Sequence, residues 1–127
     1  MLRIYLYFNA AIYLLFAAWC TVAPLETAQQ VGYAALSRSG VSEYLVVYGG
    51  IEFGLGILFL ISARRGEDAF GLRLALALYL PIVVYRWTTL ALQWPVATTT
   101  LAIGALETCL LLAALALWAQ RRKEISA

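Results

Sequence analysis

Three ionisable side chains lie inside long apolar stretches of the sequence, at Glu52, Arg86 and Glu107. A charged group in the middle of a bilayer is costly, so such residues normally face protein or a water-filled cavity and have a partner. In the helical arrangement argued below, the two carboxylates come to nearly the same depth and the guanidinium about one helical turn further out. We therefore expect Arg86 to lie between the two glutamates. Tyr48, one turn outward from Glu52, and Tyr85, next to Arg86, are placed to add hydroxyl groups to this cluster.

The charges of this cluster do not balance. Two carboxylates and one guanidinium leave an excess negative charge in a region of low dielectric constant, and the excess is avoided if one glutamate keeps its proton. Two interpretations remain open. In the first, the cluster belongs to a pocket, open toward the outer leaflet, that binds a small amphipathic or lipid-like ligand or carries a proton. In the second, it is a structural ion-pair network that fixes the register of the helices.

The stretches that carry these residues are long and apolar enough to cross a membrane. The chain has 127 residues, of which 64% are hydrophobic and 13% charged, a composition far from that of a soluble domain. Apolar runs occur at about residues 4–24, 43–63, 71–93 and 98–119, and a spanning helix needs about 20 residues. We therefore predict a single all-α domain, residues 1–127, folded as an integral membrane four-helix bundle with up-down topology.

One connection between the predicted helices is longer than the others. The segment from Pro24 to Ser42 is expected to lie on the membrane surface, either as an interfacial connector or as a lid over the outer mouth of the bundle. Ser42, followed by Glu43, has the residue type that caps a helix N-terminus, so the second helix is expected to begin there. In the third helix, Pro81 is expected to produce a kink.

The basic residues indicate the orientation of the chain. One set falls on a single side of the predicted bundle, namely Arg3, Arg64, Arg65, Arg73, Arg121, Arg122 and Lys123. On the other side, only Arg38 belongs to a loop. By the positive-inside rule we expect both termini to be cytoplasmic, in a multi-pass protein of the cell's inner membrane. The net charge of +2 follows from this asymmetry and gives no indication of nucleic-acid binding.

Four glycines surround Glu52 in the second apolar run: Gly49, Gly50, Gly54 and Gly56. Gly50 and Gly54 have the spacing that lets a second helix backbone approach closely in lipid, where no hydrophobic force drives helices together. We therefore expect this helix to pack tightly against another one. That neighbour belongs to the same chain, to a second copy in a homo-oligomer, or to another membrane protein.

Metal and cofactor chemistry are not indicated. The sequence contains no histidine, the commonest ligand of haem iron and transition metals. Cys20 and Cys109 are expected at depths that differ by roughly 9 Å, whereas a disulfide spans at most about 7 Å between Cα atoms. No nucleophile motif or cofactor fingerprint is present, so we predict no catalytic residue, metal or cofactor. Acid–base chemistry by a protonated glutamate is the one enzymatic route that the residues leave open.

The stretch YGGIEFGLGILFL, residues 48–60, resembles the second-helix signature of a small bacterial membrane-protein family known only as domain of unknown function 4345. The chain length, the four spans and the later Arg and Glu are similar to that family as well. The resemblance covers nearly the whole chain. It implies a four-helix membrane fold, distantly similar to DoxX-type proteins, and implies no particular activity.

Three functions compete. A ligand-binding or lipid-handling protein, surrounded by membrane lipids, would use the charged cluster as the polar part of an aromatic-walled pocket. An accessory or structural subunit of a larger membrane complex would need only its glycine face and its lipid face. A small proton-coupled transporter would rely on a membrane glutamate. Four-helix transporters of that kind often have a weak charge bias, however, and the bias of this chain is strong.

Overall fold

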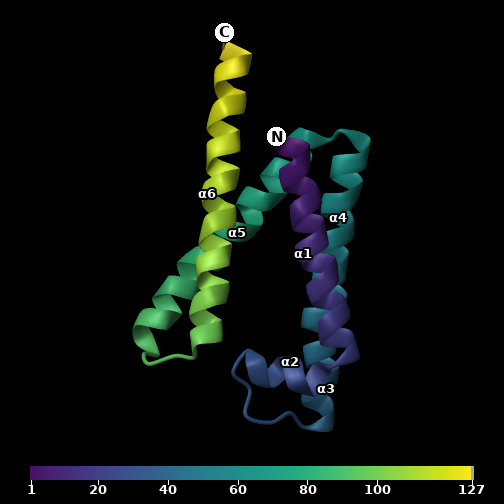
Figure 1. The fold of residues 1–127 in the computed structure, drawn as a ribbon, viewed down its shortest axis with the longest axis vertical. Coiled ribbons are helices and arrows are strands. Elements are labelled where there is room, and N and C mark those ends of the chain that lie inside the picture. Colours follow the sequence, from purple (N-terminus) through teal and green to yellow (C-terminus); the bar gives the residue numbers. More distant parts are fainter. Residues whose placement is uncertain (127) are drawn as a thin grey trace. The chain divides into compact units, whose positions relative to one another are not determined.

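The chain is almost entirely helical. The computed structural model describes residues 1–126, and Figure 1 shows their elements in order. The elements are α1 (Leu2–Val22), α2 (Pro24–Gln30), α3 (Arg38–Tyr44), the π-helix η1 (Leu45–Ile51), α4 (Glu52–Arg65), α5 (Asp68–Leu92) and α6 (Thr98–Ser126). No strand occurs among residues 1–126. The prediction of an all-α chain is confirmed.

Four helices are long and apolar enough to cross a membrane, as predicted: Leu2–Val22, Arg38–Arg65, Asp68–Leu92 and Thr98–Lys123. The second of these is continuous through α3, η1 and α4, and it begins earlier than predicted. The side chain of Ser37, and not that of Ser42, caps it, because the Ser37 hydroxyl accepts a hydrogen bond from the backbone N–H of Gly40 at 3.1 Å. The helix α5 continues through Pro81 without ending.

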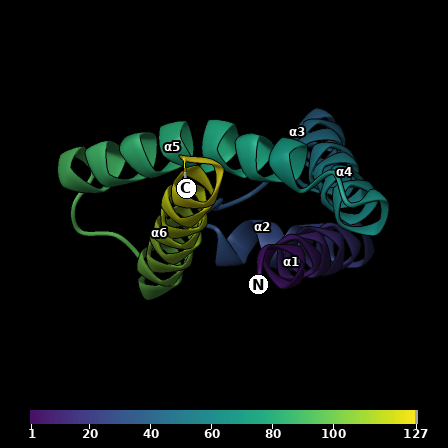
Figure 2. The ribbon, with the colours of Figure 1, turned by 90° about the horizontal axis from the view of Figure 1, so that it is seen from above.

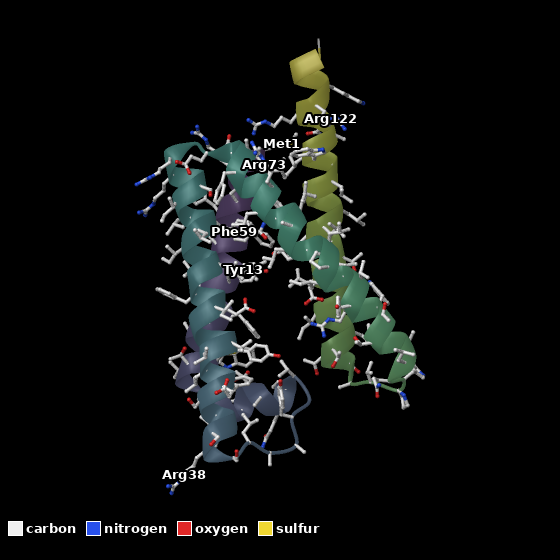
Figure 3. The ribbon with its side chains drawn as sticks, turned by 180° about the vertical axis from the view of Figure 1, so that it is seen from behind. Met1, Tyr13, Arg38, Phe59, Arg73 and Arg122 are labelled. Carbon is white, nitrogen blue, oxygen red and sulfur yellow. The ribbon has the colours of Figure 1, made fainter. Side chains whose placement is uncertain are left out.

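The internal contacts divide the chain into two compact units, Met1–Asp68 (unit 1) and Ala69–Ala127 (unit 2). In unit 1, α1 and α4 lie side by side in Figures 1 and 2. The buried positions of α1 include Leu6, Ala10 and Ala17, at the three- and four-residue spacing that puts side chains on one helix face. The rings of Tyr13 and Phe59 stack across this interface with centroids 5.7 Å apart, and Figure 3 shows the pair.

The end of α4 is defined by a glycine in a left-handed conformation. Gly66 has a φ of 71°, and the backbone N–H of Glu67 donates to the carbonyl of Ser62 at 2.9 Å, which is a Schellman ending. The first turn of α1 is anchored at the same place, because the Arg3 Nε lies 3.6 Å from Oδ1 of Asp68. Hence α1 begins where α4 ends. Met1 and Arg38 accordingly lie at opposite ends of unit 1 (Figure 3).

The other end of unit 1 is closed by the segment that links α1 to η1. Cys20, Ala28 and Tyr44 form a buried cluster there, and the Cys20 sulfur lies 3.4 Å from the Tyr44 hydroxyl. Instead of an irregular connector, this segment contains the two short helices α2 and α3. The π-helix follows at once, with the backbone N–H of Glu52 bonded to the carbonyl of Val47, five residues earlier.

Unit 2 is a hairpin of the long helices α5 and α6. Residues 93–97 connect them. Arg73, near the start of α5, and Arg122, near the end of α6, lie at the end of the unit away from this connection (Figure 3). Arg73 and Arg122 therefore lie at one end of the hairpin, and Arg3, Arg64 and Arg65 lie at one end of unit 1.

Candidate functional site

Arg86 and Glu107 form a two-pronged ion pair between α5 and α6. Nε of Arg86 donates to Oε2 of Glu107 at 2.8 Å, and Nη2 donates to Oε1 at 2.9 Å. A planar guanidinium and a carboxylate fit each other in this geometry, and two parallel charge-assisted hydrogen bonds fix distance and direction together. The pairing of these two residues, expected from their depths alone, is therefore present within unit 2.

Small and polar neighbours hold this pair in place. Gly104 lies one turn before Glu107, and a Cβ at that position would come within 3.1 Å of Cγ of Arg86. The absent side chain leaves room for the arginine stem. Beside the pair, Nε1 of Trp87 donates to Oγ1 of Thr108 at 2.9 Å, and Oγ1 of Thr108 donates to the carbonyl of Gly104 at 2.7 Å. Two adjacent contacts thus fix the register of α5 against α6.

The sequence interpretation did not identify Trp87 and Thr108 as members of this site. Their positions could have identified them. Trp87 directly follows Arg86 and Thr108 directly follows Glu107, so the two pairs have the same separation of 21 residues along the chain. The arrangement leaves both carboxylate oxygens of Glu107 occupied by the guanidinium. For these two residues, the geometry supports the interpretation as a structural ion pair.

Glu52 belongs to unit 1, so its meeting with Arg86 and Glu107 stays a prediction. Tyr48, one turn away, packs among aromatic rings: its centroid lies 4.5 Å from that of Tyr44 and 6.3 Å from that of Phe16. Tyr85 is 72% exposed, and its expected role in the cluster also stays a prediction.

Two of the four glycines make the close approach to α1. A Cβ at Gly56 would lie 2.7 Å from Cγ of Leu14, and a Cβ at Gly49 would lie 3.0 Å from Oγ1 of Thr21. These contacts place the C-terminal half of α1 antiparallel to η1 and bring Glu52 level with Ala17 and Ala18.

Gly54, one of the two glycines expected to pack most closely, makes no close approach to α1. Among the described residues of unit 1, nothing lies within 4 Å of a Cβ added at Gly54. The reason is angular, because each residue turns the helix by about 100° and Gly54 therefore lies about 200° around α4 from Gly56. A close helix contact at Gly50 and Gly54 stays a prediction.

An apolar groove lies between α1 and η1. It has a volume of about 620 Å³ and is lined by Leu14, Ala17, Ala18, Thr21, Val22, Leu45, Gly49, Gly50 and Phe53. Small residues from both helices form much of this lining, and the larger Leu14, Leu45 and Phe53 complete it. Ligand sites commonly have volumes of about 300–1,000 Å³ and mostly apolar walls. The groove is therefore large enough for a small amphipathic molecule.

No protein-family model, curated protein or solved structure matches the chain.

Proposed function

We propose that this chain is a multi-pass membrane protein that binds an amphipathic, lipid-like ligand in the groove between α1 and η1. The observation that carries the proposal is the groove itself, with its apolar lining and its volume of about 620 Å³. Its only side-chain hydroxyl is that of Thr21, which donates to the carbonyl of Ala17 at 2.7 Å. A hydrocarbon chain suits such a surface, because it offers apolar contact and needs no hydrogen-bonding partner.

Filling the groove should abolish binding. Ala18 lines the groove and is exposed there, so Ala18→Trp would place an indole where the ligand lies. The added side chain would overlap the ligand, so saturable cross-linking should fall to the background level. The measurement is saturable cross-linking of the purified protein by a long-chain fatty acid that carries a diazirine.

Ala11→Trp is the matched control for this experiment. Ala11 is exposed on the same face of α1, two turns away, and does not line the groove. Cross-linking should remain at the wild-type level in this variant. Equal cross-linking of Ala18→Trp and wild-type protein would contradict the proposed function.

We further propose that the chain lies in the cell's inner membrane with both termini in the cytoplasm. The basic residues at one end of each unit support this orientation. In a background with Cys20→Ala and Cys109→Ala, Ser39→Cys should react with an impermeant maleimide in intact cells. Ser126→Cys should react only after the cells are permeabilised. The reverse pattern would show that the orientation is wrong.

The second candidate function is that of an accessory subunit in a larger membrane complex. The spacing of Gly50 in η1 and Gly54 in α4 favours it, because small residues at this spacing suit close helix packing and, among the described residues of unit 1, nothing lies within 4 Å of a Cβ added at Gly54. The proposed membership of the family called domain of unknown function 4345 is compatible with either function, since the resemblance implies a four-helix membrane fold and no activity.

A further inference from the structure

We draw no further inference here: the strongest candidate, the apolar groove of about 450 Å³ near the α5–α6 connection, lined by Trp87, Leu90, Ala91, Trp94 and Leu101, carries none because nothing in the structure shows what covers it.

Discussion

Arg86→Leu should be strongly destabilising. The substitution removes two hydrogen bonds, of 2.8 and 2.9 Å, and leaves Glu107 without the guanidinium that occupies both of its oxygens. Removing one partner of a buried ion pair typically costs about 3 to 5 kcal/mol, mainly because the remaining group loses its compensation. Because 29% of the Arg86 side chain and 15% of the Glu107 side chain are exposed, we expect a loss at the lower end of this range in the free energy of unfolding, measured by denaturant titration in mixed micelles.

The double variant Arg86→Leu, Glu107→Leu is the control. It removes both charges, and apolar replacement of a whole pair is often nearly neutral, so it should be more stable than either single variant. If Arg86→Leu and Glu107→Leu each caused the same small loss in the free energy of unfolding, and the double variant lost the sum of the two, the ion pair would contribute nothing to stability.

Glu52→Gln tests whether the third charge joins this pair. If Glu52 is the glutamate that keeps a proton, glutamine resembles its neutral form and the loss should be mild. Glu107→Gln should be more damaging, because an amide offers one oxygen where the carboxylate offers two. Equal losses for Glu52→Gln and Glu107→Gln would contradict this assignment of the proton.

Gly56→Leu should separate α1 from α4. A Cβ at this position would lie 2.7 Å from Cγ and 2.9 Å from Cδ2 of Leu14, and 3.2 Å from the backbone nitrogen of Leu14. The side-chain atoms can move, but the backbone nitrogen can move only with the helix. Overpacking typically costs about 1 to 3 kcal/mol, and we expect the upper end of that range because backbone is involved. The measurement is again unfolding in mixed micelles.

The control for the Gly56 prediction combines a larger residue at Gly56 with a smaller one at Leu14. Leu14→Ala should reduce the effect of Gly56→Ala, because the two substitutions alter the same contact and should not be additive. The coupling should be absent between Gly56→Ala and Ala11→Leu, since Ala11 is exposed. Full additivity of the Leu14 and Gly56 substitutions would contradict the close approach.

Hydropathy was sufficient to predict the spans, because about 20 consecutive apolar residues have few other folds available to them. It was not sufficient for the end of unit 1 that contains α2 and α3. The helices α2 and α3 have seven residues each, too short for a periodic pattern to distinguish them from a loop. Ser37 and Ser42 were equally suitable caps by residue type, and only the geometry selects Ser37.

The height of a residue along its helix was easier to predict than the face of the helix on which its side chain lies. The pairing of Arg86 with Glu107 followed from their heights in adjacent helices joined by a short connection. The glycine contact depended on angle as well, because α1 approaches at Gly49 and Gly56, whereas the small-residue spacing had pointed to Gly50 and Gly54. The spacing of seven residues from Gly49 to Gly56 was the informative pattern, since two helical turns return to nearly the same face.

The π-helix before Glu52 also has an evolutionary consequence. A wide turn of this type corresponds to one extra residue inserted into an α-helix. Tyr44, directly before it, stacks on Tyr48 and reaches Cys20. Deleting one residue between Leu45 and Ile51 would restore regular α-helical winding. It would also rotate everything before the deletion by about 100° and carry Tyr44 away from Cys20. In descendants of a common ancestor, the inserted residue and the contact between the thiol and the phenol should therefore be inherited or lost together.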